Sequence, residues 1–189
     1  MRHTTFVMLA RLACLASAGC GGPPAVPRAA EQNAAVAERV IDAFYSFDRD
    51  RLASALAAAD ASAPAILFYQ GWAEGGNYRV RRRAPCQPEA RDTVRCAITV
   101  EDDLIKALRL GIQVTDTFRI TVAGGRVRRV TTSSNDPPLF DEAMAWVRRE
   151  RADRIRVPCA GFFAGGPTPA ACVRTIVEGF AEFSAQRPR

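Results

Sequence analysis

The chain has almost no histidine and almost no lysine. Of its 189 residues one is histidine, His3, and Lys106 is the single lysine among 26 lysine and arginine residues. His3 lies in a leader that we expect to be removed, so the exported part has no imidazole. This excludes serine–histidine and cysteine–histidine nucleophiles and an aspartate–histidine dyad. Because the cysteines also lack C-x2-C spacing, we expect no metal site, and no motif indicates a cofactor.

The chain also lacks a second long apolar run, an internal repeat and a glycine-rich phosphate loop. Its net charge is +6, and removal of residues 1–19 leaves 24 basic residues against 20 acidic ones, a net charge of +4. This modest charge does not indicate a nucleic-acid partner. About 170 residues remain, which is enough for one domain with a hydrophobic core.

Residues 1–19 have the layout of a secretory signal, with Arg2 followed by a largely apolar run from Phe6 to Ala18 that only Arg11 interrupts. The run is too short for a membrane-spanning helix, so we expect it to be cleaved off. Two cleavage sites compete. Ala16-Ser17-Ala18 suits ordinary signal peptidase, whereas Leu15 to Cys20 resembles a bacterial lipoprotein box, with serine at a position where that family usually has an aliphatic residue.

The flexible stretch Gly21-Gly22-Pro23-Pro24 after Cys20 favours the lipoprotein interpretation, in which the Cys20 thiol carries lipid. Residues 20–30 would then link the membrane to the folded domain. By the same resemblance, Gly21 in place of aspartate indicates an outer membrane lipoprotein that faces the periplasm. A soluble periplasmic or secreted protein is the alternative.

The remaining cysteines independently predict export. Of six cysteines, Cys14 leaves with the leader and Cys20 would carry lipid, so four remain: Cys86, Cys96, Cys159 and Cys172. An even number fits two disulfides in an oxidising compartment. Three pairings are open to four cysteines, and the simplest joins the neighbours, Cys86 with Cys96 and Cys159 with Cys172.

Hydrophobic periodicity predicts three helices before any strand, over residues 31–48, 51–59 and 62–75. The period then changes to two and predicts strands over 78–84, 94–100, 112–122 and 126–134. Gly124-Gly125 predicts a tight hairpin turn between the last two strands. An irregular connection with one helical turn is expected over 102–111, and helices are expected from Asp136 to about Arg154 and from Thr168-Pro169 to about Ala185.

Helices followed by a curled antiparallel sheet predict an α+β domain. The stretch from Val36 to about Asp136 also resembles the NTF2-like superfamily, the cone-shaped fold of SnoaL-type and ketosteroid-isomerase-type proteins. The resemblance is carried by Ile41-Asp42-Ala43-Phe44-Tyr45, by the short helix from Leu52 to Ala59 and by the hairpin from Val122 to Val127. It implies three N-terminal helices packed on a curved sheet over residues 31–136, with residues 137–189 as an appended helical segment outside the core fold.

Isomerases and cyclases of that superfamily hold acids, tyrosine or histidine inside the cone, where desolvation moves their pKa values toward neutrality. Aligned on Leu52, the isomerase tyrosine falls on Ala43, so the resemblance does not provide this oxyanion donor. Alternation on the predicted strand 112–122 places Asp116 on an otherwise apolar face, together with Ile112, Val114, Phe118, Ile120 and Val122.

Asp116 has a functional and a structural interpretation. As a cavity carboxyl it would orient a ligand or abstract a proton, and the expected ligand-binding residues are then Tyr69, Trp72, Tyr78, Asp116 and Phe118. At an open rim, or paired with an arginine, it would be structural only. The aromatic residues also have both a functional and a structural interpretation, because tyrosine and tryptophan at helical spacing also occur in ordinary cores.

Arginines cluster on two of the predicted strands, and these residues are Arg79, Arg81, Arg82, Arg83, Arg126, Arg128 and Arg129. They would either bind anionic lipid head groups or envelope polymers, or form a solvated outer sheet face that is partly paired with acids.

Two functional hypotheses remain. The first is a non-catalytic envelope lipoprotein that binds a small apolar ligand or a protein partner, with a homodimer through the sheet as one expected assembly. The second is a small-molecule isomerase or dehydratase with Asp116 as general base. We favour the first hypothesis, because the familiar catalytic groups are missing.

Overall fold

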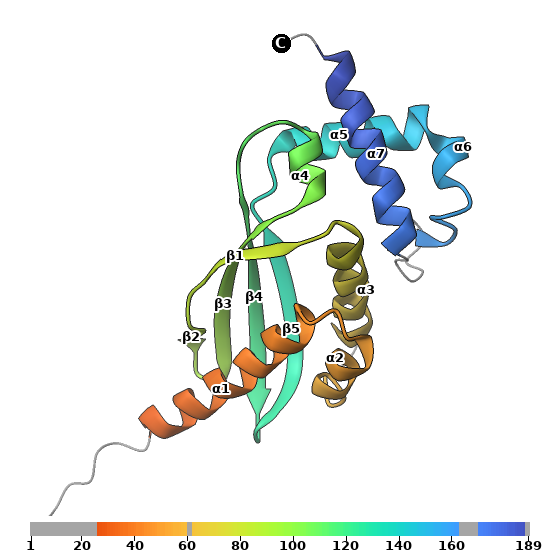
Figure 1. Ribbon diagram of the computed structural model, residues 1–189. Coiled ribbons are helices and arrows are strands. Elements are labelled where there is room, and N and C mark those ends of the chain that lie inside the picture. The colour runs from red at the N-terminus through yellow and green to blue at the C-terminus, as the bar shows by residue number, and fades with distance from the viewer. Residues whose placement is uncertain (1–25, 60–61, 163–169, 188–189) are drawn as a thin grey trace, which may run out of the picture.

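The chain forms an α+β fold with a five-stranded antiparallel sheet in the computed structural model, which describes residues 26–59, 62–162 and 170–187 (Figure 1). This confirms the predicted fold class. The helices are α1 (Val26–Phe44), α2 (Arg49–Ala55), α3 (Ser62–Gly75), α4 (Asp103–Ala107), α5 (Pro138–Glu150), α6 (Ala152–Ile155) and α7 (Ala170–Gln186). The strands are β1 (Arg79–Arg83), β2 (Gln87–Ala90), β3 (Thr93–Glu101), β4 (Val114–Ala123) and β5 (Arg126–Ser134).

The sheet has the order β1-β3-β4-β5, and β2 also pairs with β3. Alternation along β4 buries one face of the strand, where Val114, Asp116, Phe118, Ile120 and Val122 are all at most 1% exposed. The predicted start of this strand at Ile112 is wrong, because β4 begins at Val114 and Ile112 is 44% exposed. The predicted glycine turn joins β4 to β5, and both of its glycines have positive φ.

Helix α1 lies across the buried face of the sheet, and α3 lies beside β5 (Figure 1). A spacing of three to four residues puts Val36, Val40 and Phe44 on one stripe, and all three are buried. The buried Gln70 of α3 donates from Nε2 to the carbonyl oxygens of Ala43 and Phe44, both at 3.1 Å. These bonds tie α3 to the end of α1, where the same two carbonyls also accept from the Ser46 hydroxyl and the Phe47 amide.

The C-terminal helices share the hydrophobic core with the rest of the chain. The buried side chains of Val173 and Phe180 in α7 belong to the same cluster as those of α1, α3 and the sheet. Gly75 at the end of α3 lies directly against Val173 and Ala170. The described part of residues 137–189, which we predict to be an appended helical segment, packs against α3 and α4.

Several element boundaries differ from the prediction. Helix α1 begins at Val26, inside the predicted linker 20–30, and α2 covers only Arg49–Ala55. The helix predicted from Asp136 to Arg154 is divided into α5 and α6, because Arg151 leaves the helical conformation at φ −128°. Strand β2 was not predicted; Pro88 weakens the strand pattern there, and the strand is tolerated because it pairs on one side only, with β3.

Two disulfides connect these elements, Cys86–Cys96 between the start of β2 and β3, and Cys159–Cys172 between the region after α6 and α7. Both join the cysteines that are neighbours in the sequence, and they fit an exported protein. Cys20, the leader and the predicted Thr168-Pro169 cap lie outside the described residues. Within the described ranges, no helix is both long enough and apolar enough to cross a membrane.

Candidate functional site

Strand β4 places Asp116 under the helices. Its side chain faces the core because it alternates with Val114 and Phe118, and the residue is 0% exposed. In the sheet it lies opposite Ile98 of β3 and Ser134 of β5. No arginine or lysine makes an ion pair with it in the described structure.

Two tyrosines, one in α3 and one just after α1, donate hydrogen bonds to Asp116. The Tyr69 hydroxyl of α3 donates to Oδ1 of Asp116 at 2.6 Å, and the Tyr45 hydroxyl just after α1 donates to Oδ2 at 2.9 Å. Each carboxylate oxygen therefore has a donor, and such charge-assisted bonds are stronger than neutral ones. The arrangement joins α1, α3 and β4 at one buried point.

Burial dominates the electrostatics of this group. Desolvation raises the pKa of Asp116 to about 6, although the bonds from Tyr69 and Tyr45 oppose the shift. Desolvation, and then the neighbouring charges, also raise the pKa values of Tyr45 and Tyr69 well above 10. Both hydroxyls consequently keep their protons and remain donors over the physiological pH range.

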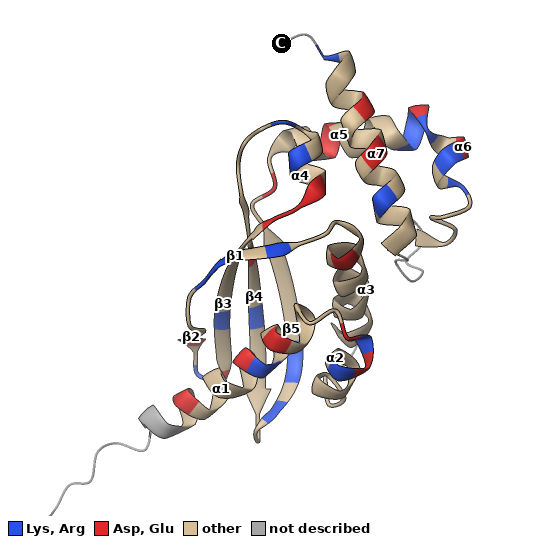
Figure 2. Ribbon diagram, in the orientation of Figure 1, with Lys and Arg blue, Asp and Glu red and all other residues tan. Residues whose placement is uncertain are grey.

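Two further carboxyl groups lie near this network. Asp102 is 1% exposed and caps α4 by accepting from the Ile105 amide at 2.8 Å, and burial raises its pKa to about 6. Asp136 lies between β5 and α5 and is exposed; desolvation and the neighbouring Asp141 raise its pKa, and a hydrogen bond with Ser134 opposes the shift. Figure 2 shows acidic residues gathered where β3 leads into α4. Among the described residues, no group of three potential ligands is placed to hold a metal ion.

An aromatic cavity of about 360 Å3 opens beside Asp136. It lies between α3, the end of β5, the start of α5 and the turn that follows α6. The residues that line it are Phe68, Tyr69, Trp72, Tyr78, Thr132, Ser133, Ser134, Asp136, Phe140 and Phe162. Aromatic rings and a few hydroxyl groups thus make most of its wall.

The rings of this wall pack against one another. Phe162 is stacked on Trp72 with ring centroids 5.7 Å apart and on Phe68 at 5.1 Å, and Tyr69 meets Tyr78 edge to face at 6.4 Å. These are favourable aromatic geometries. The wall is held in place by its own contacts, so the cavity is formed before any ligand arrives.

The structure brings the predicted site residues together in two layers. Tyr69, Trp72 and Tyr78 line the cavity, whereas Asp116 and Phe118 are not part of its wall and lie beneath it, at 0% exposure. Tyr69 connects the layers, since its ring is in the wall and its hydroxyl bonds Asp116.

Tyr45 was not among the predicted site residues. The family alignment pointed to Ala43, but the tyrosine that reaches the carboxyl is two residues further on, one helical turn after Ile41. The spacing of four residues from the buried Ile41 was the available signal.

No protein-family model and no curated protein matches this chain.

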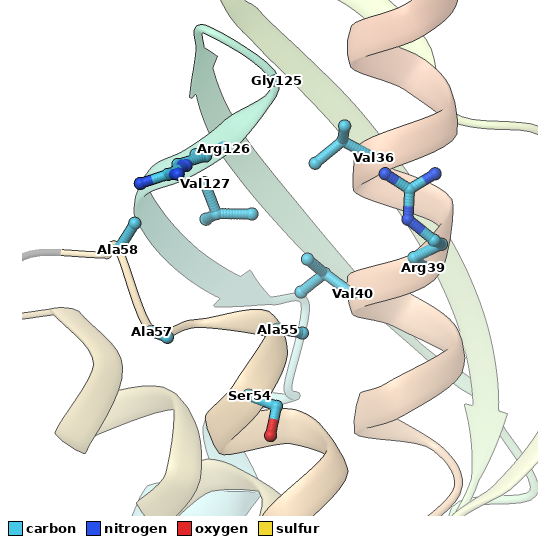
Figure 3. Close-up of a pocket in the computed structure, with 10 residues that line it drawn as sticks. All are labelled: Val36, Arg39, Val40, Ser54, Ala55, Ala57, Ala58, Gly125, Arg126 and Val127. Carbon is cyan, nitrogen blue, oxygen red and sulfur yellow. The ribbon is translucent and has the colours of Figure 1, made fainter.

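A second cavity of about 320 Å3 has a different chemistry. It lies between α1, the α2 region and the β4–β5 turn (Figure 3). Figure 3 shows Val36, Val40 and Val127 between these elements, with Arg39 on α1 and Arg126 on the hairpin. No aromatic or acidic residue is among its described lining, and none of the predicted site residues belongs to it.

The predicted arginine face is exposed and partly paired with acids. On β1, Arg81 forms an ion pair with Glu101 at 2.5 Å, and Arg83 bonds Asp42 at 2.6 Å and also pairs with Glu38. On β5, Arg126, Arg128 and Arg129 are exposed. The pairs on β1 agree with a solvated sheet face, and exposed pairs of this kind contribute little to stability.

Proposed function

We propose that this protein is an exported binding protein that takes a small apolar ligand into the aromatic cavity and performs no chemical step on it. The observation that carries the proposal is the cavity itself, about 360 Å3 in volume and walled by aromatic rings with a few hydroxyl groups. Small-molecule sites are usually built in this way, apolar with a small number of polar groups that fix orientation. A protein partner bound through the same face is the other occupant consistent with our sequence analysis.

The proposal includes an NTF2-like cone as the scaffold. Support comes from the arrangement of α1 and α3 over the buried face of a curved antiparallel sheet, and from the resemblance of the Ile41–Tyr45 segment and the Val122–Val127 hairpin. An internal carboxyl under the helices is in keeping with such a fold.

The proposal also includes anchoring through a lipid on Cys20 at the outer membrane, facing the periplasm. The two disulfides support export, and the sequence around Cys20 supports lipidation. Mass spectrometry of protein from the membrane fraction should find a diacylglyceryl group on Cys20 and no free thiols. An unlipidated N-terminus at Gly19 or Cys20 would favour the soluble periplasmic or secreted alternative.

An isomerase or dehydratase activity is the second candidate function. It is favoured by one observation: the 2.6 Å bond from Tyr69 to Asp116 could carry a proton between the cavity and a carboxyl whose pKa is about 6. The binding proposal remains stronger, because Asp116 itself is fully buried and both of its oxygens already accept hydrogen bonds. Loss of turnover in Asp116→Asn, with ligand affinity retained, would support the enzyme, whereas absence of turnover on a steroid and polyketide panel would remove it.

The binding proposal can be tested with the fluorescence of Trp72. The chain has two tryptophans, and Trp146 does not line the cavity, so Trp146→Phe leaves Trp72 as the single emitter. Titration with the neutral apolar probe N-phenyl-1-naphthylamine should quench Trp72 by energy transfer and should saturate at one probe per chain.

A pair of β5 variants provides the control. Thr132 lies opposite Phe118 on the inner side of the sheet and lines the cavity, whereas Thr131 lies opposite Arg119 and does not. Thr132→Phe should fill the cavity and weaken probe binding by roughly tenfold or more, and Thr131→Phe should leave it unchanged. Equal binding by both variants, or no saturable binding by the parent protein, would contradict the proposal.

A further inference from the structure

The charge of the aromatic cavity limits the class of ligand that it can bind. Asp136 is the one carboxyl group among the described lining residues, and neither arginine nor lysine is among them. Aromatic rings present the negative side of their quadrupole at the ring face. Carboxylate and rings therefore give the wall a negative potential.

Buried carboxyl groups add to this potential from behind. The pKa of Tyr78 is raised by burial and then by the charges of Asp102, Asp116 and Asp136, so all three acids act on one residue of the wall. None of the three forms an ion pair with a basic side chain in the described structure. The negative charge under the cavity is thus not compensated by the protein.

The hydrogen-bonding capacity of the wall points in the same direction. The hydroxyl proton of Tyr69 is already donated to Asp116 at 2.6 Å, so toward a ligand this hydroxyl can act only as an acceptor. The Asp136 carboxylate is likewise an acceptor. A ligand that carries N–H donors or positive charge finds partners here, and an anion does not.

From this we infer that the ligand of the aromatic cavity is an organic cation, an amine or quaternary ammonium group attached to an apolar body, with the charge placed beside Asp136 and the apolar body against the aromatic side chains of the wall. The inference rests on the proposed binding function and specifies its ligand class. The second cavity provides an internal contrast, since it is lined by Arg39 and Arg126 and has no aromatic ring. A cation is expected to bind at the first cavity and not at the second.

The test compares two probes of the same shape. 4-(Trimethylammonio)benzyl alcohol and 4-tert-butylbenzyl alcohol differ only by a charged nitrogen in place of a carbon. Each is titrated by calorimetry at pH 7.5 and low salt into the full exported chain, with 4-(hydroxymethyl)benzoate as the anionic comparison. We expect the cation to bind roughly tenfold more tightly than its neutral isostere, and the anion to bind least.

Variants then test which residue causes the preference for the cation over the neutral probe. Asp136→Asn keeps the shape of the cavity wall and should reduce the ratio of cation to neutral affinity by several-fold, whereas Asp92→Asn, in the exposed turn between β2 and β3, should leave the ratio unchanged. Arg39→Gln in the second cavity should also leave it unchanged. A preference that survives Asp136→Asn undiminished would overturn the assignment of the charge to this wall.

The remaining outcomes separate this inference from the proposed function. If the neutral probe binds as tightly as the cation, or the anion binds best, the cavity is a ligand site but the cation assignment is wrong. If N-phenyl-1-naphthylamine and all three benzyl alcohols fail to bind, the proposed function falls as well, and this inference with it.

Discussion

Burial of Asp116 costs free energy of folding, although both of its carboxylate oxygens accept hydrogen bonds. Moving a carboxylate out of water costs several kcal/mol unless it is compensated, and here no cation neutralises it. Two phenol donors at 2.6 and 2.9 Å offset part of that cost. The raised pKa shows that desolvation still outweighs the hydrogen bonds. The protein therefore retains an acid that opposes its own folding at neutral pH.

This residue should make stability fall as pH rises. Well below pH 3.8 Asp116 is protonated in both the native and the unfolded chain, so it has no effect on stability. Between pH 4 and 6 the unfolded chain loses the proton first, because the native pKa is about 6 against 3.8 for the free group. The native state then loses on the order of 3 kcal/mol from Asp116 by pH 7. Asp102, also raised to about 6, adds to the same trend.

Asp116→Asn should flatten this dependence. The amide keeps the shape of the side chain and can bond both phenol oxygens, but it does not ionise. Urea unfolding at pH 4.5, 6.0 and 7.5 should show a smaller loss of unfolding free energy in Asp116→Asn than in the parent protein. Asp92→Asn in an exposed turn is the matched control and should follow the parent protein. Parallel pH profiles for Asp116→Asn and parent would show that Asp116 has an ordinary pKa.

The sequence identified Asp116 and placed Tyr69 near it, but it did not indicate Tyr45. Strand alternation alone put an acid on the apolar face of β4, because period two is a local property of a strand. Its hydrogen bonds join residues 71 and 47 positions apart, Tyr45 and Tyr69, which no local pattern records. The same limit applies to Asp136, whose place in the cavity wall depends on how β5, α3 and α5 meet.

At the scale of elements, the crossing of α5 and α7 depends on one glycine. Gly179 lies in the middle of α7, where glycine costs about 1 kcal/mol relative to alanine. A Cβ at this position would lie 2.5 Å from Cγ2 of Val147, a fully buried residue of α5. The glycine is therefore explained by close helix packing.

Gly179→Ala should destabilise the protein even though alanine is the better helix former. We expect a loss of about 1–3 kcal/mol from overpacking, which exceeds the gain in helix propensity. Thermal unfolding of the single variants and of Gly179→Ala with Val147→Ala tests the cause. The double variant should lose less unfolding free energy than the two single variants lose together, since the smaller side chain of Val147→Ala makes room for the new methyl group. Additive losses in the double variant would count against a steric cause.

Elements with strong local signals were predicted well and weak ones were not. Ser62 and Gly75 mark both ends of α3 as expected, and Gly124-Gly125 forms the expected turn. Strand β2 was missed because its four residues, Gln87–Ala90, are all exposed and include Pro88. It is held by pairing with β3 and by the Cys86–Cys96 disulfide, which are tertiary features.

At the scale of the whole molecule, the described chain after residue 136 contributes buried side chains to the same hydrophobic core as the chain before it. Trp72 of α3 lies between Phe140 of α5, 6.2 Å away, and Phe162 after α6, 5.7 Å away. The end of α3 also lies against α7, where Gly75 meets Val173. Periodicity predicted these later helices but gave no sign of where they would dock, and so residues 31–136 looked like a complete domain.

A fragment that ends at residue 136 should therefore fail to fold cooperatively. It loses the rings that cover Trp72 and the α7 face that covers Gly75, which leaves a contiguous apolar surface in water. Trp72 is the one tryptophan in this fragment, and it is also the one tryptophan in full-length Trp146→Phe, so the two emission spectra can be compared directly. We expect emission at longer wavelength and a broad, non-cooperative urea transition for the fragment, against a sharp transition for the full-length control. Cooperative unfolding with a buried Trp72 in the fragment would instead establish residues 31–136 as an independent domain, with the C-terminal helices as the appended segment that the sequence predicts.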